Sequence, residues 1–371
     1  MARLKRIVLP EDSKFLRRLP ASKLDDPDFV KAFDQHTLFY DTFYDAETGL
    51  ITLVGPSLKT QRRFFRGAHF KVDGTPIPDF TLDLVSPRTS QVSFPSPNDD
   101  PKNLRLFHRV QPVLNAQVLI GRAQHDKFAG KNALVAISKN NNLAWIQDWL
   151  SYYVTEHGAN AVVLIDNGST DYDLRALRQC IIGVKGLEAA EIVSAPFPFG
   201  PKAVDRISTN SKFFHLSVLH IAHKRFLARA NAVLSVDIDE LVTKAGGQSV
   251  FEAVKATPRG FMSIPGTWRY ARRPATSDAV IRHADHVLRR KGRDGTMQPK
   301  WCLDPSGLAG GKYWRVHGIL GERRYHDHDY RYLHCRQITT NWDYDRDYED
   351  ENDFEEAPEA DAIRQAFSEF A

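Results

Sequence analysis

The chain has 371 residues, 42% of them hydrophobic, and a formal net charge of +4 at pH 7. This length exceeds that of one typical hydrophobic core, so we expect two domains, or one large domain with an extension. No segment has the ~18–20 consecutive apolar residues of a membrane span, and residues 1–10 lack the apolar stretch of a secretory signal.

Charge is distributed unevenly along the chain. From Asp343 onward there are twelve acidic residues and two basic ones, a net of −10, so the remainder carries about +14. We expect this acidic tail, residues 343–371, to be solvated and poorly ordered; the alternative is that it docks on the basic body. The basic body favours anionic nucleotides or peripheral contact with a membrane surface. It has no basic helix with interleaved aromatic residues, so nucleic-acid binding is not expected.

The three cysteines lie far apart in the sequence and show no metal-ligand spacing; they are Cys180, Cys302 and Cys335. Such a set is typical of free thiols in a reducing compartment, so we expect a cytoplasmic location.

Residues 1–130 contain short β-rich runs separated by Gly, Pro, Asp and Asn. This spacing predicts a small antiparallel β-sandwich or barrel as an N-terminal domain. The expected strands are Thr37–Tyr44, Leu50–Val54, Ala68–Val72, Phe80–Val85, Gln91–Phe94 and Val113–Ile120.

Residues 131–342 alternate strands with helices, which predicts an α/β domain with a largely parallel sheet. The expected strands are Leu134–Ile137, Ala161–Ile165, Ala232–Asp237, Phe261–Ile264 and Trp314–Gly318. The expected helices are Leu143–His157, closed by Gly158, Asp171–Ile182, Ser211–Arg229, and a helix opened by a capping box at Ser249 and Glu252.

Two polar strings follow buried strands of this α/β region. Asp166-Asn167-Gly168-Ser169-Thr170-Asp171 comes after Ala161–Ile165, and Asp237-Ile238-Asp239-Glu240 comes after Ala232–Val236. Ligands of open α/β sheets bind outside the carboxyl ends of the strands, so both strings are expected at one cleft. An Asp-x-Asp pair there supplies hard oxygen ligands for a divalent cation, which shares its shell with substrate phosphates. The pattern indicates a nucleoside-diphosphate site.

These strings also carry a resemblance to a known family. Ala136–Asn142, the helix start Trp145–Trp149 and the two Asp strings resemble the motifs of GT-A fold glycosyltransferases, in particular the family 2 / family 92-like group. The resemblance runs from about Leu134 to Trp342, and four later blocks follow in the group's order: Trp268-Arg269, Pro299-Lys300-Trp301, His317 and Leu333-His334. One departure is Asn141, which stands where the group usually has Glu.

The resemblance implies transfer of a sugar, with inversion, from a nucleotide-sugar such as a UDP-sugar to a glycan or lipid-linked acceptor, as in surface-polysaccharide synthesis. It implies Mn²⁺ or Mg²⁺ held by Asp237, Asp239 and His317, with His317 the closest of the later residues to Asp239. The implied donor-binding residues are Lys139, Asn142, Asp166, Asp237, Trp268, Lys300 and His334. The catalytic base is not assigned by the pattern; Asp327 and Asp329 are the candidates, with Asp304 and Glu322 as alternatives.

Other interpretations of these residues remain open. Asp166 is also a natural former of a turn with Asn167 and Gly168, and Asp171 suits the N-cap of the next helix. The stretch from Tyr325 to Asp329 is rich in His and Asp but lacks the spacing of a zinc site. A HAD-like Mg²⁺-dependent phosphohydrolase also places Asp-x-Asp after a strand, although it expects Thr at position 241, which is Leu. A non-catalytic nucleotide- or glycan-binding module is the other alternative.

Overall fold

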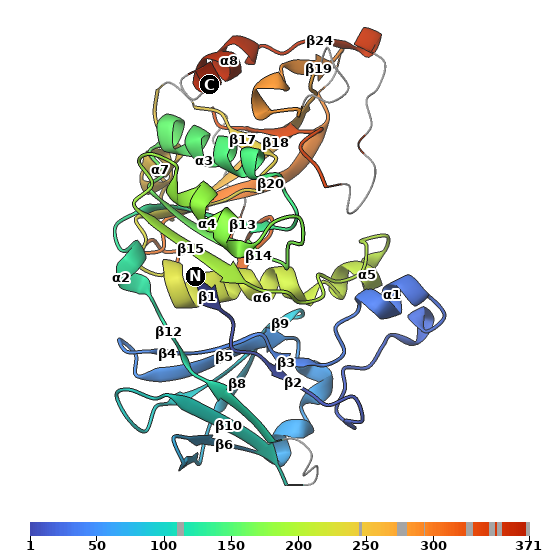
Figure 1. Ribbon diagram of the computed structural model, residues 1–371, viewed down its shortest axis with the longest axis vertical. Helices are drawn as coiled ribbons and strands as arrows, with labels where there is room; N and C mark the ends of the chain where they lie inside the picture. The colour runs from blue at the N-terminus through green and yellow to red at the C-terminus, as the bar shows by residue number, and fades with distance from the viewer. Residues whose placement is uncertain are drawn as a thin grey trace. The chain divides into compact units, whose positions relative to one another are not determined.

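The structure is a computed structural model that describes residues 1–109, 115–244, 247–272, 280–292, 294–323, 329–340, 346 and 351–368. The chain forms two compact units, one made of Met1–His125 with Val193–Phe226 and the other of Asp126–Ile192 with Leu227–Ala371 (Figure 1). The second unit starts close to the predicted boundary at residue 130, but residues 193–226 return to the first unit. No helix in the described ranges is long and apolar enough to cross a membrane.

The first unit is built on two largely antiparallel sheets that enclose one apolar core, and one of them includes the parallel pair β12 and β4. Alternating side chains of the strands, such as Ile51, Leu53, Phe70, Phe94 and Leu104, are fully buried between them. One sheet has the order β12-β4-β5-β9-β8 and the other β11-β10-β6-β7. The bounds are β4 Asp41–Asp45, β5 Leu50–Pro56, β6 Ala68–Val72, β7 Thr75–Ile77, β8 Thr81–Ser86, β9 Thr89–Pro95, β10 Asn103–His108, β11 Asn115–Leu119 and β12 Gly121–Arg122.

This is the β-rich N-terminal fold that the sequence predicts, with β7 and β10 as additional strands in one of its two sheets. The remaining elements of the unit are short: β1 Ala2–Arg3, β2 Ile7–Val8, η1 Ala21–Lys23, α1 Pro27–Ala32, β3 Thr37–Phe39, η2 Lys59–Gln61, η3 Phe64–Arg66 and α2 His125–Phe128 at its border. Residue 113, where the last strand was expected to begin, lies outside the described residues.

The single helix expected over residues 211–229 is shorter in the structure, where it consists of α6 Phe213–Ala222 and a π-helical turn η4 His223–Leu227, and a separate short helix, α5 Arg206–Asn210, precedes it. Ser211 is the C-cap of α5, and its hydroxyl donates to the carbonyl of Ile207 at 2.9 Å. α6 packs on the first sheet: the Ser217 hydroxyl donates to the carbonyl of Gly55 at 3.2 Å, and His220 pairs with Gln91 at 2.9 Å. These contacts explain why this segment belongs to the first unit.

The second unit contains a sheet whose strands follow the order β15-β14-β13-β16-β20-β18-β23-β17. β13 pairs in parallel with both β14 and β16, whereas β20 pairs antiparallel with both β16 and β18. The bounds are β13 Asn132–Ser138, β14 Ala161–Asp166, β15 Ala189–Ser194, β16 Ala232–Ser235, β17 Glu240–Val242, β18 Phe261–Arg269, β20 Thr296–Leu303 and β23 Tyr332–Cys335. The predicted α/β fold class is confirmed, with a mixed sheet.

Helices of the second unit begin and end largely where capping residues predict. α3, Leu143–His157, matches the expected helix and ends at Gly158, whose φ of +67° favours glycine. α7, Val250–Lys255, has the predicted capping box of Ser249 and Glu252. α4, Leu174–Ile182, is capped by Asp173, which accepts from the Ala176 amide, so the expectation that Asp171 is the cap is wrong.

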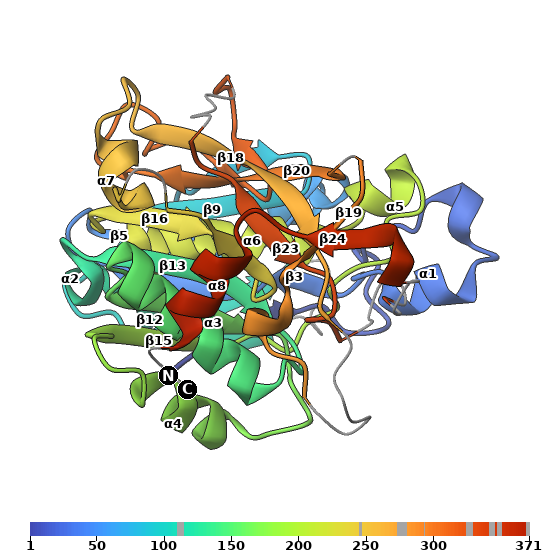
Figure 2. The same ribbon diagram turned by 90° about the horizontal axis from the view of Figure 1, so that it is seen from above.

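The second unit also has short elements around its sheet, and they include the part of the acidic tail that the structure describes. They are η5 His283–Asp285, β19 Leu288–Arg290, β21 Trp314–Arg315, β22 Gly318–Ile319, η6 Glu351–Asp353, β24 Phe354–Glu356 and α8 Ala360–Ser368. β24 pairs with β19, and α8 lies beside α3 (Figure 2).

The prediction of a solvated tail is therefore wrong for residues 351–368. Ile363 and Phe367 of α8 are at least nine-tenths buried, and Phe367 stacks on Tyr152 with ring centroids 5.7 Å apart. Arg269, which is fully buried, donates to Glu359 at 2.8 Å just before α8 begins. Helical spacing of a few apolar residues, together with one buried ion pair, outweighs the high acidic content.

Candidate active site

The two predicted Asp strings lie at the same end of the sheet, where β14 and β16 have their carboxyl ends. Asp166 is the last residue of β14 and pairs in register with Ser138 of β13, while Ser235 of β16 pairs with Val135 of the same strand. Asp237 follows two residues beyond Ser235. Because β13 separates β14 from β16, the backbones at these two ends are about two strand spacings, roughly 10 Å, apart. One nucleotide spans such a distance.

The turn that carries Asp237–Glu240 is held by buried side chains of α3 and η5. The Tyr153 hydroxyl donates to the carbonyl of Glu240 at 3.0 Å and accepts from the Val242 amide at 2.9 Å. His283 pairs through Nε2 with the carbonyl of Ile238 at 2.7 Å, so that nitrogen carries the proton. The Asp237 amide donates to the Glu240 carboxylate at 2.8 Å. These bonds fix the direction of the acidic side chains before any ligand arrives.

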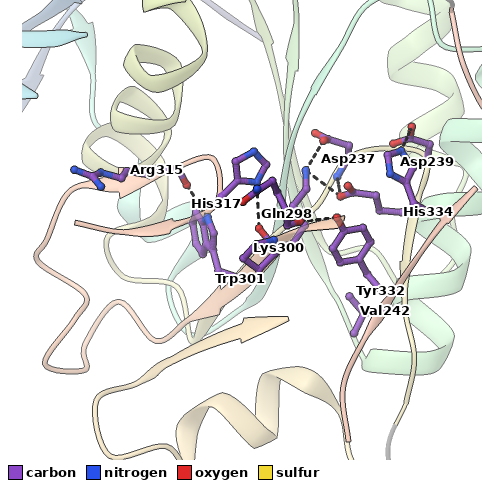
Figure 3. Close-up of polar contacts among 12 residues, drawn as sticks. Asp237, Asp239, Val242, Gln298, Lys300, Trp301, Arg315, His317, Tyr332 and His334 are labelled. Carbon is purple, nitrogen blue, oxygen red and sulfur yellow. Dashed lines mark hydrogen bonds and ion pairs between the residues drawn. The ribbon is translucent and has the colours of Figure 1, made fainter. Parts of the chain in front are cut away.

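Lys300 of β20 neutralises part of this acidic turn (Figure 3). Its ammonium contacts the carboxylate of Asp237 and lies 3.0 Å from that of Glu240, and its side chain is only 5% exposed. Burial by itself lowers the pKa of Lys300, but Asp237 and Glu240 more than offset this and hold it above its usual value. Burial raises the pKa of Glu240 to about 7 despite the lysine. Lys300, predicted as a phosphate ligand, is thus anchored to the acidic turn.

Asp239 has two different partners. Its Oδ2 accepts from His334 Nε2 at 2.8 Å and from Arg346 Nη1 at 2.8 Å. Burial opposes ionisation of this carboxyl, yet His334 and Arg346 hold the pKa of Asp239 below its usual range. His334 stacks on Trp268 with ring centroids 4.1 Å apart, and the Arg346 guanidinium lies 5.4 Å from the centre of the same ring. Two residues predicted for donor binding, Trp268 and His334, are therefore brought to Asp239.

Sequence reasoning did not single out Arg346. The available signal was that Arg346 and Arg364 are the two basic residues from Asp343 onward. A rare cation in an acidic stretch is a candidate partner for a carboxylate elsewhere in the chain, and here that partner is the half-buried Asp239.

Three of these residues have donor atoms suited to a metal ion. Asp239, Glu240 and His334 place one ligand atom each within 4.8 Å of one another. Two carboxylate oxygens and an imidazole nitrogen form a donor set that suits Mn²⁺. The set fits the predicted cation, although Asp239 Oδ2 must then exchange its present bonds to His334 and Arg346 for the ion.

His317 is not the histidine beside Asp239, and the prediction that it lies closest is wrong. His317 Nδ1 pairs with the Pro299 carbonyl at 3.1 Å, and Figure 3 shows the ring beyond Lys300 as seen from Asp239. His334 takes that place because β23 pairs with β17 in a register that aligns His334 with Glu240. Trp301, which belongs to one of the later blocks of the resemblance, is fully buried and donates to the Arg315 carbonyl at 2.7 Å.

Asp166 forms the predicted turn and still retains one acceptor. Its Oδ2 accepts from the amides of Gly168 at 3.1 Å and Ser169 at 3.2 Å. Its Oδ1 is buried and has no hydrogen-bond partner within the described part of the chain. A buried carboxylate oxygen without a donor is costly unless a ligand supplies one. The turn-forming and ligand-binding interpretations of Asp166 are thus compatible.

The loop after β13 is joined to the Asp166 loop. The Thr170 amide donates to the side chain of Asn140 at 2.7 Å. Asn142 accepts from the Ala144 amide at 2.8 Å and caps α3, and its part in donor binding stays a prediction. Lys139 is exposed on the same loop, at the edge of the sheet where Asp166 lies.

The carboxylates considered as a catalytic base fall into two groups. Asp304 pairs with Lys255 at 2.9 Å, and Glu322 pairs with Arg259 at 2.7 Å. The bond from Arg259 lowers the pKa of Glu322 to about 2, so this carboxylate is a poor proton acceptor. Asp329 is exposed, and Asp327 lies outside the described residues.

No protein-family model matches the sequence, and no curated protein matches it either. Among solved structures, the chain overlaps an active-site mutant of LgtC with 13% identity and a TM-score of 0.28, covering 50% of this chain and 60% of that one. It overlaps the galactosyltransferase LgtC in complex with donor and acceptor sugar analogues with 14% identity and a TM-score of 0.25, covering 50% and 56%.

A third overlap is with the mannosyltransferase Ktr4p from S. cerevisiae in complex with GDP, at 14% identity and a TM-score of 0.25, covering 38% of this chain and 40% of that one. The matched regions thus span less than two thirds of each of these chains. With TM-scores this low, the overlaps carry no argument about activity, which depends on the site itself.

Proposed function

We propose that the chain is a glycosyltransferase that takes a sugar from a nucleotide-sugar donor with the help of Mn²⁺ or Mg²⁺. The observation that carries the proposal is the grouping of Asp239, Glu240 and His334 within 4.8 Å at the sheet edge where Asp166 keeps a buried, unused acceptor oxygen. One end of this edge suits the diphosphate and the other suits the hydrogen-bond donors of a base or ribose.

Each residue has a defined part in this proposal. Asp166 accepts from the base or ribose of the nucleotide, Asp239, Glu240 and His334 hold the cation, and Lys300 fixes Asp237 and Glu240 in place. When bound, the cation neutralises the departing nucleoside diphosphate. Trp268, stacked against His334, borders the position of the sugar.

In an inverting transfer, an acceptor hydroxyl forms a bond to the anomeric carbon as the bond to the diphosphate breaks, and a carboxylate takes the hydroxyl proton. We assign this role to Asp327 or Asp329, because Asp304 and Glu322 are held in ion pairs with other side chains. We propose a UDP-sugar as donor and a glycan or lipid-linked acceptor, as in surface-polysaccharide synthesis.

A non-catalytic nucleotide-binding module is the second candidate. It is favoured by Asn141, whose amide donates to Ser138 at 3.0 Å in the place where related enzymes usually have Glu. Such a module would bind a nucleotide-sugar without consuming it.

Calorimetry with UDP tests the site, first with Mn²⁺ and then with EDTA. We expect binding only with the ion, and loss of at least tenfold in affinity in Asp239→Asn, since charge-assisted contacts contribute about 1.5–3 kcal/mol. Asp171→Asn, an exposed acid on the Asp166 loop, is the matched control and should bind normally. Equal UDP affinity in EDTA would refute the cation site.

Turnover separates the enzyme from its alternatives. Incubation with UDP-sugars and Mn²⁺ should release UDP in the wild type and not in Asp239→Asn. Binding without release of UDP would support the module, and release of inorganic phosphate from a phosphate monoester would support a phosphohydrolase.

A further inference from the structure

The first unit carries a strongly basic surface that the proposed sugar transfer does not use. Residues 59–72 contain five Lys and Arg residues, residues 101–109 contain three, and neither stretch contains Asp or Glu. Within these stretches, β6 and β10 are adjacent antiparallel strands (Figure 1). Cations from two separate parts of the sequence are therefore gathered on one sheet.

The register shows how they are arranged. Lys71 of β6 lies opposite Arg105 of β10, on the face turned away from the core, because their neighbours Phe70, Leu104 and Leu106 are buried inside. At the end of the same strands, the Arg109 amide donates to the Gly67 carbonyl at 3.0 Å, next to Arg66. Arg62 and Arg63 precede this point in the turns around η2 and η3. We call this set the basic face: Arg62, Arg63, Arg66, Lys71, Arg105 and Arg109.

The cations of the basic face are available to a partner. Lys71 is half-buried and the other five side chains are exposed. In the described ranges, none of the six forms an ion pair with an acidic side chain, although the nearby Lys102 pairs with Asp100 at 2.6 Å. Six like charges without counterions repel one another, so an anionic partner of matching extent is bound with a favourable electrostatic energy.

The aromatic residue on this face decides which anionic partner fits. The Phe107 ring is flanked by His69, stacked at 5.3 Å, and by the cations of Lys71 at 5.7 Å and Arg105 at 5.8 Å. These neighbours occupy the ring, so it offers no free platform for a base or a sugar. Binding of single-stranded nucleic acid depends on such platforms. Binding to a membrane of anionic lipids requires only that cations lie near the membrane plane. Each Lys or Arg near that plane contributes about 1 kcal/mol to the binding free energy.

One further side chain on the face favours a lipid surface. Leu119 of β11 lies opposite Asn103, on the same side as Arg105, and is 59% exposed. A cluster of cations beside an exposed leucine supplies both the electrostatic and the apolar part of peripheral membrane binding.

We propose that the basic face docks the protein onto anionic phospholipid headgroups. The proposal does not depend on sugar transfer, because none of its residues belongs to the candidate active site. If transfer to a lipid-linked acceptor is also correct, the basic face holds the enzyme at the surface where that acceptor lies.

Vesicle co-sedimentation tests the proposal, with the full-length protein and no nucleotide. Vesicles of one part phosphatidylglycerol to three parts phosphatidylcholine should bind the wild type at 0.1 M salt and release it at 0.5 M, because salt screens exposed charges. Pure phosphatidylcholine vesicles should not bind it.

Charge reversal locates the surface. Arg62→Glu/Arg66→Glu/Arg109→Glu should weaken vesicle binding by roughly a hundredfold or more, at about fivefold for each cation removed. The control Lys31→Glu/Lys202→Glu/Arg206→Glu reverses three exposed cations elsewhere in the same unit and should keep most of the binding. Both variants should retain the wild-type melting temperature and UDP binding.

Three results would overturn the proposal. The first is absence of wild-type binding to the anionic vesicles, and the second is an equal loss in both triple variants, which would indicate a response to net charge alone. The third is tighter binding to single-stranded DNA or to a sulfated polysaccharide than to the vesicles, which would assign the face to a different polyanion.

Discussion

Arg346 Nη1 lies 2.8 Å from Asp239 Oδ2, on the one carboxylate oxygen that also accepts from His334. Asp239, Glu240 and His334 are the group that fits a divalent ion. A guanidinium and an ion cannot both occupy the same side of Asp239, since their charges repel at short range. The arginine is therefore a competitor of the cation that the proposed reaction requires.

Arg346→Ala should consequently bind Mn²⁺ more tightly than the wild type does in the absence of nucleotide. We expect a gain of roughly ten- to a hundredfold, since the bond that the ion no longer has to displace is worth about 1.5–3 kcal/mol. Calorimetric titration with Mn²⁺ alone measures it. Arg336→Ala is the matched control, because Arg336 also lies over Trp268, at 5.5 Å. Unchanged affinity in Arg346→Ala would show that the ion binds elsewhere.

Two substitutions distinguish the turn-forming role of Asp166 from its ligand-binding role. Asp166→Asn keeps an oxygen for the amides of Gly168 and Ser169 but loses the charge. It should preserve the melting temperature and weaken UDP binding by about 1–3 kcal/mol. Asp166→Ala removes both roles and should lower stability as well. A normal UDP affinity in Asp166→Asn would leave the residue as a turn former only.

Removing Lys300 should lower the free energy of unfolding, because the acidic turn then has no neighbouring cation. Lys300→Met leaves Asp237 and Glu240 without their cation, and deletion of one partner of a buried pair typically costs about 3–5 kcal/mol. Urea denaturation measures the loss. Lys255→Met, whose ion pair with Asp304 is partly exposed, should cost less than about 1 kcal/mol. A similarly small effect for Lys300→Met would mean that the turn is stable without its cation.

Because α8 packs on the second unit, we expect Phe367 to behave as a core residue although the surrounding segment is acidic. Phe367→Ala should destabilise the protein by about 3–5 kcal/mol, the usual cost for truncating a buried Phe. Gln365→Ala, on the exposed side of the same helix, should change stability by less than about 0.5 kcal/mol. Thermal unfolding distinguishes the two variants. Equal melting temperatures would show that α8 does not pack on the second unit.

Because the ring of His157 is buried in its neutral form, we expect the protein to lose stability in acid. Burial lowers its pKa to about 4, and its ring pairs with the Val242 carbonyl and accepts from the Val250 amide, which requires the neutral form. In the unfolded chain the pKa is about 6.5. Between these values the unfolded state binds the extra proton, so stability falls as the pH drops from about 6.5 to about 4.

The full effect of His157 is about 3 kcal/mol, from a shift of roughly 2.5 pKa units. Burial also lowers the pKa values of His220 and His286, so the informative quantity is the difference in slope between the wild type and His157→Gln. Urea midpoints measured from pH 7 to pH 4.5 should fall less steeply in the variant. Identical slopes would show that His157 does not contribute to acid sensitivity.

Short-range patterns predicted the parts of the site that depend on one strand and the turn after it. Asp166 and Asp237–Glu240 follow β14 and β16 as expected, because an apolar run that ends in carboxylates has few other arrangements. The choice of His334 over His317 depends on the register between β17 and β23, whose strands are about ninety residues apart in sequence. No local pattern encodes that register. Arg346 was missed for the same reason.

Composition misled where it was used in place of periodicity. The net charge of the last segment suggested solvation, although Ala360, Ile363 and Phe367 repeat at helical spacing. The long helix expected over residues 211–229 was likewise an apolar run read as one element, and it forms α6 and the π-helical turn η4, with α6 packed on the first sheet. In both regions a few specific contacts outweighed the average character of the segment.

The first unit is made from two stretches of chain, with sixty-seven residues of the second unit, 126–192, between them. During synthesis, the sandwich of residues 1–125 leaves the ribosome well before α6, which supplies Ser217 and His220 to the Gly55 and Gln91 side of its sheet. This side of the first sheet has no helix over it until residues 126–192 of the other unit have been synthesised. A fragment cut near residue 130 would therefore lack the helix that covers this side of its own sheet.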